Sequence, residues 1–158
     1  MCEALSGACS TQSPVDVIAR QAKLDSLCNA QHADCLMCGH ANPIGLKLKF
    51  RVQPDGSVAS MFPCRDAFRS YPEFLHGGVI SALLDAAMTN ALFSIDVVGV
   101  TAELSIRFLA PVALNRGAVM RACVERNDNP LFYLRAELEQ DQKTMARATA
   151  KFLVKDCL

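Results

Sequence analysis

The chain has 158 residues, of which 51% are hydrophobic, and its formal net charge at pH 7 is zero. This length and apolar fraction predict one domain with a sizeable core, and the balanced charge gives no indication of a nucleic-acid partner. The first residues include an acid and form no apolar run. We therefore expect no secretory signal, no membrane partner and a cytoplasmic location.

The N-terminal part is predicted to be an accessory region. We expect residues 1–12 to be disordered. A helix should follow, with Ser13 as its cap and Pro14 in its first turn, and should run to about Asn29. Residues 13–45 would then form this helix and a cysteine-containing lead-in to a domain over residues 46–155, with a single domain overall.

The chain contains eight cysteines. Without a secretory signal, reduced thiols are favoured over a disulfide framework. Cys35 and Cys38 are two residues apart, and with His32 and His40 they supply the ligand types of a zinc site, but no second paired cluster follows. The favoured interpretation is a tight structural turn with no metal. Zinc binding by these four residues stays open as an alternative.

Alternation of apolar and polar residues predicts most of the remaining structure. It predicts a strand over residues 46–53, a turn at residues 54–56, a strand over residues 57–63 and a loop over residues 65–73. Four more strands are predicted at residues 100–108, 118–126, 132–138 and 146–154. In the first of these, Leu104 and Phe108 have the apolar parity and Thr101 has the polar parity.

Residues 79–94 form an apolar stretch that predicts a helix wrapped by the rest of the protein. Its polar residues Ser81, Asp85 and Thr89 are spaced by four, so they share one stripe. One long helix packed against a curved antiparallel sheet is an α+β fold.

Two features near this helix can do chemistry. The Gly77-Gly78 turn permits close approach of a ligand and opens a helix whose first amides can hold a developing oxyanion. Asp85 is a carboxylate in an apolar helix and is therefore a candidate functional group. The alternative is a structural Asp bonded to a nearby amide or hydroxyl.

The motifs at these positions resemble those of the PaaI-like (phenylacetyl-CoA type) acyl-CoA thioesterases. The resemblance is carried by His76-Gly77-Gly78 with Asp85 seven residues beyond, by the Cys-x-x-Cys-Gly-x-x-Asn-Pro-x-Gly-Leu pattern of residues 35–46, and by the strand at residues 100–108. It spans about residues 35–154. It implies the hotdog fold, in which an antiparallel sheet wraps around one long central helix.

The resemblance also implies an activity and the residues that perform it. The activity is hydrolysis of a small or medium acyl-CoA or acyl-carrier thioester, without a cofactor. Asp85 would act as general base or nucleophile, the Gly77 amide would polarise the carbonyl, and Thr101 would help to place water. His76 would shape the turn, with a role as free general base as the alternative. The expected substrate-binding residues are Gly78, Arg69, Ser81 and Met88.

Two positions depart from the pattern of the family. Arg69 stands where the related branch has a Gln, and Glu73 stands where it has a Gly. Arg69 would bind a substrate phosphate or the carbonyl, or else it is a solvated loop charge.

The spacing of the two candidate groups predicts an oligomer. Gly78 and Asp85 are two helical turns apart, roughly 10 Å along the axis. Groups that act on one carbon must approach within about 3–3.5 Å, so the site would combine two protomers. We expect a homodimer or a dimer of dimers. Three alternatives stay open: a non-catalytic acyl-CoA-binding or structural hotdog protein, a hotdog dehydratase (whose His-x-x-x-Pro-Gly lead-in is missing) and a zinc-binding regulator.

Overall fold

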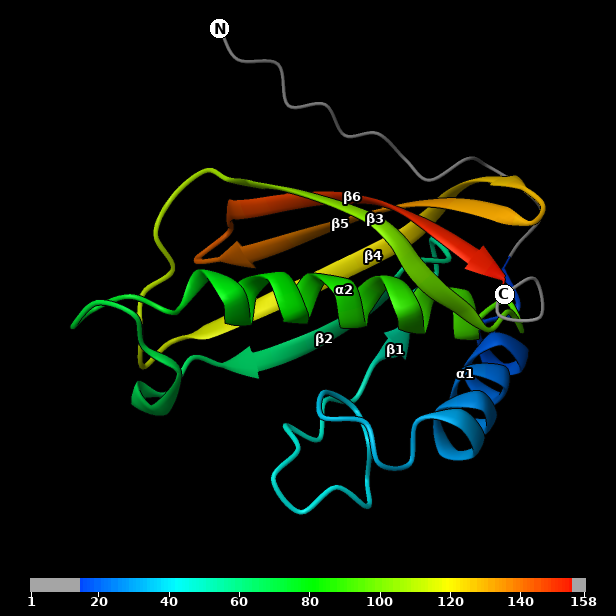
Figure 1. The fold of residues 1–158 in the computed structure, drawn as a ribbon, viewed down its shortest axis with the longest axis horizontal. Helices are drawn as coiled ribbons and strands as arrows, with labels where there is room; N and C mark the ends of the chain where they lie inside the picture. Colours follow the sequence, from blue (N-terminus) through cyan, green and yellow to red (C-terminus); the bar gives the residue numbers. More distant parts are fainter. Residues whose placement is uncertain (1–14, 155–158) are drawn as a thin grey trace, which may run out of the picture.

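The structure is a computed structural model that describes residues 15–154 (Figure 1). The predictions for residues 1–12 and for Ser13 and Pro14 lie outside the described residues. The elements are α1 (Val17–Gln31), β1 (Arg51–Val52), β2 (Val58–Pro63), η1 (Asp66–Phe68), α2 (Gly77–Phe93), β3 (Gly99–Phe108), β4 (Gly117–Asp128), β5 (Leu131–Gln140) and β6 (Lys143–Val154).

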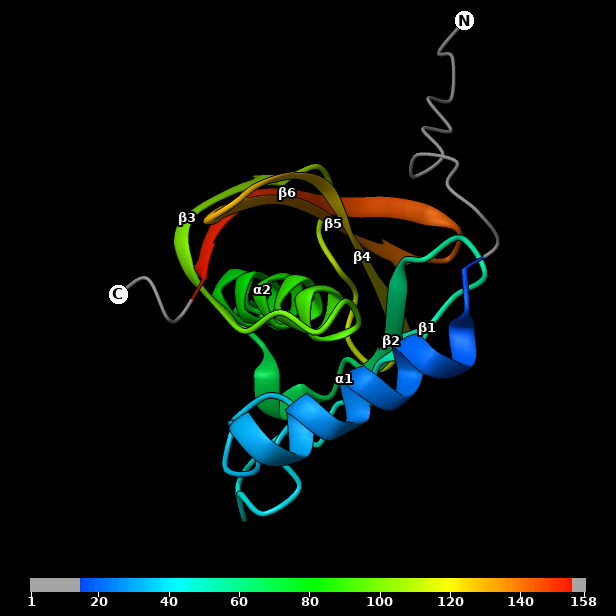
Figure 2. The same cartoon turned by 90° about the vertical axis from the view of Figure 1, so that its right-hand side faces the viewer.

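The strands form one antiparallel sheet of six strands in the order β1-β2-β4-β5-β6-β3. Figure 2 shows this sheet curling around α2, so that the helix lies inside the concave face. This is the predicted α+β architecture of a hotdog fold, and the prediction is confirmed. Among the described residues, no helix is long and apolar enough to cross a membrane.

The core lies between α2 and the concave face of the sheet. Leu83, Leu84 and Met88 of α2 are fully buried, and each such side chain contributes about 1.5–3 kcal/mol through burial. The facing positions of the sheet carry small residues, including Ala136 and Ala148, which allow the helix to approach closely. Met88 was expected to bind substrate, but it has an exposed fraction of 0%. The structure therefore places Met88 in the core.

Helix α1 lies beside the C-terminal end of α2 (Figure 1) and also contacts the short strand β1. It begins at Val17, because Asp16 is the N-cap and its carboxylate accepts the Ala19 amide at 2.9 Å. Within the described residues the helix therefore begins at Val17, and it ends at Gln31, two residues after the predicted Asn29. Arg20 ties α1 to the end of α2 by donating to the Ser94 hydroxyl at 2.8 Å.

The segment at residues 46–53 differs from its prediction. The predicted alternation of burial is present, with Leu48 and Phe50 inside, but only Arg51–Val52 pairs as a strand. The amides of Leu46 and Leu48 donate to the carbonyls of Leu36 and Met37, so the segment is held by the cysteine-containing loop and not by the sheet. The predicted loop at residues 65–73 also contains the short helix η1.

Candidate active site

The edge strand β3 carries a bulge that decides where Thr101 points. The register between β3 and β6 shifts between Thr101 and Glu103. Before the bulge, Thr101 pairs with the buried Phe152, and after it Leu104 pairs with the buried Ala150. Directly opposed residues of two strands lie on the same face of the sheet. Thr101 therefore faces α2, and the polar parity predicted for it was wrong because a bulge adds one residue to the strand.

Asp85 meets Thr101 across the gap between α2 and β3. The Thr101 hydroxyl donates to Asp85 Oδ1 at 2.6 Å, and the carboxylate is half-buried. The other hydroxyls of the stripe are used elsewhere, because Ser81 donates to the Gly77 carbonyl at 3.0 Å and Thr89 donates to the Asp85 carbonyl at 3.1 Å. A carboxylate fixed by one hydroxyl keeps its second oxygen available for a water molecule.

His76 is the N-cap of α2, and its ring determines which amides remain free. Its Nδ1 accepts the Gly78 amide at 2.9 Å. With Nδ1 accepting, the neutral ring carries its proton on Nε2. Neither ring nitrogen then offers a free lone pair. This geometry favours the turn-shaping role of His76 over the role of free general base.

The Gly77 amide is the one left open at this helix start. Within residues 15–154 it has no hydrogen-bond acceptor, whereas the next amides are satisfied by His76. Gly77 lines an open groove of about 430 Å³. A Cβ placed on Gly77 would lie 3.6 Å from the Phe108 ring, so the aromatic side chain packs directly over this turn. The other apolar groove residues include Tyr71, Phe74, Leu75, Ile80 and Val112.

Two further predicted binding residues lie beside this groove. Gly78 is exposed, but its amide is already bonded to His76. Arg69 is exposed and its backbone bridges to Leu75, which lines the groove. In the described part of the chain, the Arg69 guanidinium has no ion-pair partner.

Asp85 and Gly77 cannot serve the same thioester from one protomer. Both lie on the continuous helix α2, and eight residues correspond to about 12 Å along a helix axis. The predicted need for a second protomer is therefore unchanged by the structure.

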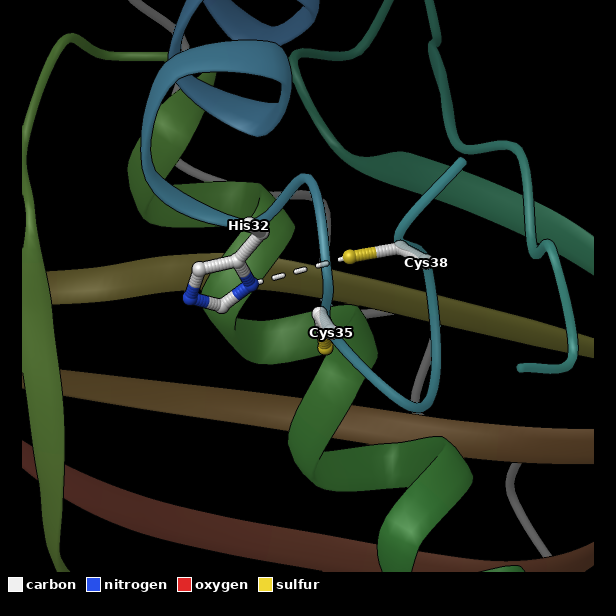
Figure 3. A group of neighbouring side chains, drawn as sticks. All are labelled: His32, Cys35 and Cys38. Atoms are coloured by element: carbon white, nitrogen blue, oxygen red, sulfur yellow. Dashed lines mark hydrogen bonds between the residues drawn. The ribbon is translucent and has the colours of Figure 1, made fainter. Parts of the chain in front are cut away.

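A second group of reactive side chains lies at the other end of α2. His32 Nδ1 is 3.6 Å from Cys38 Sγ, and the ligand atoms of His32, Cys35 and Cys38 all lie within 4.8 Å of one another (Figure 3). A hydrogen bond with Cys38 lowers the pKa of the Cys28 thiol. The same bond, together with burial, raises the pKa of Cys38 to about 12. His40 is not part of this group.

An antiparallel sheet wrapped around one long helix is the hotdog fold. In this protein the helix also carries a carboxylate and begins with a free amide. Residues 73–146 match the family model of the thioesterase superfamily. No curated protein sequence matches the chain. Over these residues the chain is similar to the thioesterase superfamily, and this similarity supports a thioester hydrolase of the PaaI-like kind. The resemblance drawn from the sequence motifs is confirmed.

Solved structures show the same architecture. The PaaI protein of the Escherichia coli phenylacetic acid degradation operon is 17% identical, with a TM-score of 0.72 over 87% of this chain and 94% of that chain. A phenylacetic acid degradation-related protein of Ralstonia eutropha is 29% identical, with a TM-score of 0.63 over 69% and 86%. A hypothetical thioesterase protein of Streptococcus pneumoniae, solved with coenzyme A, is 19% identical, with a TM-score of 0.64 over 68% and 88%.

Proposed function

We propose that the protein hydrolyses a small or medium acyl thioester of coenzyme A or of an acyl carrier, with Asp85 as general base. The observation that carries this proposal is the 2.6 Å hydrogen bond from Thr101, which fixes a half-buried carboxylate on an otherwise apolar helix. A carboxylate in such a setting can take a proton from water at the moment of attack.

In the proposed reaction, Asp85 takes a proton from a water molecule while the water oxygen attacks the thioester carbonyl carbon. The carbonyl oxygen becomes an oxyanion that accepts a hydrogen bond from the Gly77 amide. When the tetrahedral intermediate collapses, the carbon–sulfur bond breaks and the thiolate leaves with the proton held by Asp85. The products are a carboxylic acid and a free thiol. If Asp85 acts as nucleophile, an anhydride forms first and water then cleaves it.

The Streptococcus pneumoniae protein supports these roles. It was solved with coenzyme A, and two further structures of it carry an Asp-to-Ala and a Thr-to-Ala substitution at positions 16 residues apart. Asp85 and Thr101 are separated by the same 16 residues. This correspondence favours a coenzyme A thioester as the substrate and this pair as its site.

We further propose a homodimer, with a dimer of dimers as the larger assembly. Strand β3 is the last strand of the sheet, and its residues Val100, Leu104 and Phe108 have exposed fractions of 38%, 37% and 52%. A long edge strand with exposed apolar side chains is a ready surface for pairing with another chain. A second copy seated there would bring the partner's Gly77 toward Asp85, which one protomer cannot do alone.

Several arginines could bind the phosphates of coenzyme A, but some of them already form ion pairs with carboxylates. Arg116 pairs with Asp141 at 2.7 Å and Arg147 pairs with Glu137 at 3.1 Å. Arg69 and Arg107 are both exposed and take part in no ion pair among residues 15–154. We therefore assign phosphate contacts to Arg69 and Arg107, and contacts near the carbonyl to Gly78 and Ser81.

One observation favours a second function. Arg69 replaces the Gln of the related branch, and no described side chain holds its guanidinium in place. A protein that binds an acyl thioester without hydrolysing it would also present the groove and the turn. Turnover distinguishes the two functions, since a binding protein releases no thiol.

The test is a free-thiol release assay over a panel of aliphatic and aromatic acyl-CoAs. Asp85→Asn is compared with wild type, and Asp96→Asn serves as the matched control because it makes the same chemical change at an exposed residue beyond α2. Asp96 has φ of 67°, a conformation that Asn tolerates. We expect Asp85→Asn to lose at least about 10²-fold in rate and Asp96→Asn to keep its rate. Tight binding of the panel without thiol release by wild type would establish the binding protein instead.

A further inference from the structure

We propose that Cys28, His32, Cys35 and Cys38 form a structural zinc site that fastens α1 and the loop after it to the central helix α2. This inference does not depend on the proposed function, because the four residues lie outside the site built around Asp85. Figure 3 shows three of these side chains gathered where the loop passes over α2.

The distances among these side chains match a shared metal ion. Zinc binds thiolate sulfur at about 2.3 Å and imidazole nitrogen at about 2.0–2.1 Å, so two such ligands at tetrahedral corners lie about 3.6 Å apart. His32 Nδ1 and Cys38 Sγ are 3.6 Å apart, and Cys35 Sγ lies within 4.8 Å of both. A hydrogen bond alone would explain why His32 and Cys38 are close, but it would not explain why the Cys35 thiol lies beside both of them.

Cys28 supplies the fourth ligand. It lies one helical turn before His32, so the two side chains leave the end of α1 on the same face. Its thiol hydrogen-bonds with that of Cys38 and also approaches the Cys38 carbonyl at 4.0 Å. The sequence pattern had suggested His40 in this place. Both Cys28 and His40 lie outside the group of three whose ligand atoms fall within 4.8 Å of one another, and Cys28 is preferred because it hydrogen-bonds with Cys38, whereas His40 is exposed.

The turn from Cys35 to Gly39 is built to bring two sulfurs together. The Met37 amide donates to Cys35 Sγ at 3.4 Å, and the Gly39 amide donates to the Cys35 carbonyl at 2.9 Å. A Cβ on Gly39 would lie 2.4 Å from the Cys35 nitrogen and 2.5 Å from the Ala33 oxygen, so only glycine fits. The Met37 amide is therefore placed as an outer-shell donor that orients the Cys35 sulfur.

Helix α2 provides the second layer of contacts. Asn90 has an exposed fraction of 1%; its side chain hydrogen-bonds to Cys38, and its amide group also donates to the Ala86 carbonyl at 2.8 Å. The Asn90 Oδ1 has no partner within the described residues. Burying an amide oxygen without a hydrogen-bond partner costs free energy. A role in positioning the Cys38 sulfur as a metal ligand would explain why Asn90 is buried here. The His32 ring packs edge-on against Phe93 at 4.9 Å.

The chemistry of these ligands selects the ion and its role. Thiolates and an imidazole in a compact group suit zinc and do not suit magnesium or calcium, which prefer oxygen ligands. Four protein ligands leave no open coordination position, so the ion would stabilise structure and would not activate water.

The experiment measures metal in wild-type protein purified under reducing conditions without added zinc, and repeats the measurement after reconstitution with zinc. We expect one zinc per chain. After exchange with Co²⁺, the wild-type protein should show thiolate-to-cobalt charge-transfer bands and the strong visible bands of tetrahedral cobalt. Because this spectrum is recorded on folded wild type, it stays informative if a cysteine variant does not fold.

Matched variants identify the ligands. We expect His32→Ala and Cys35→Ser to lose most of the bound metal and the cobalt charge-transfer bands. His40→Ala and Cys64→Ser, which change a neighbouring histidine and a buried thiol outside the group, should keep one zinc per chain. Wild type that takes up no zinc on reconstitution, or freshly reduced wild type that forms a disulfide within the group in place of binding Co²⁺, would overturn the proposal.

Discussion

Thr101 Oγ1 lies 2.6 Å from Asp85 Oδ1 because a bulge in β3 turns this threonine toward the central helix. Without the bulge, Thr101 would lie on the outer face of the sheet with Glu103, which pairs there with Lys151 at 2.6 Å. Bulges commonly re-aim a side chain next to an active site. The bulge therefore brings an edge strand and a helix together at one carboxylate.

Removing the Thr101 hydroxyl should impair the reaction without disturbing the fold. We expect Thr101→Val, which keeps the shape of the side chain, to lower kcat/KM by about tenfold or more, since a hydrogen bond to a charged group is worth about 1.5–3 kcal/mol. Thr101→Ser keeps the hydroxyl and should restore most of the rate. Steady-state kinetics of both variants tests this, and equal activity of the valine and serine variants would show that the hydrogen bond has no part in the reaction.

The Gly77 amide can be removed with little change to the backbone. Gly77 is the first residue of α2, where proline is well tolerated, and His76 has φ of −65° and ψ of 132°, which suit a residue before proline. We expect Gly77→Pro to lose about 10²-fold or more in kcat because the oxyanion loses its donor. Gly77→Ala keeps the amide and should stay within about tenfold of wild type. Similar kcat values for these two variants would contradict the oxyanion role.

The role of His76 can be separated into capping and catalysis. Loss of an N-cap costs about 1 kcal/mol, so His76→Ala should lower the free energy of unfolding by about that amount. Asparagine is a good N-cap, and His76→Asn should keep both the stability and most of the activity. Denaturant unfolding and the thiol-release assay measure the two effects. An inactive but stable His76→Asn protein would indicate that the imidazole is the general base after all.

Chelation should change which cysteines react. In the zinc-loaded protein we expect Cys28, Cys35 and Cys38 to be protected from iodoacetamide, and in the chelated protein Cys28 should react first, because its hydrogen bond with Cys38 lowers its pKa. Cys64 should stay slow in both states, since burial raises its pKa to about 11. Peptide mapping by mass spectrometry reads the result. Labelling of the three thiols that is the same with and without chelator would argue against metal protection.

Much of this fold could be predicted from the sequence because burial follows simple periodicity. The apolar helix was predicted at residues 79–94 and is Gly77–Phe93, and the last three strands lie where alternation placed them. Residues 46–50 show the limit of this signal. Their alternation correctly predicted which side chains are inside, but not that their amides bond to a loop rather than to a strand.

The site was only partly predictable. The residue types and spacing around His76 and Asp85 indicated a thioesterase, but strict alternation assigned Thr101 to the wrong face, since a bulge leaves no signal in apolar periodicity. Met88 was expected to bind substrate but is buried, because helix periodicity does not say which face of the helix the sheet covers. Cys28 was missed as a neighbour of Cys38 because the contact depends on how α1 ends, and the spacing of four to His32 was its one signal in the sequence.

The most direct test of the shared active site is activity in mixed oligomers. Asp85→Asn and Gly77→Pro are each expected to be inactive alone. If each site combines Asp85 of one protomer with the partner's Gly77, then random pairing of equal amounts leaves one intact site in half of the dimers, and co-expression should restore about a quarter of wild-type activity. If both groups act within one protomer, the mixture will be as inactive as either variant, which would contradict the account.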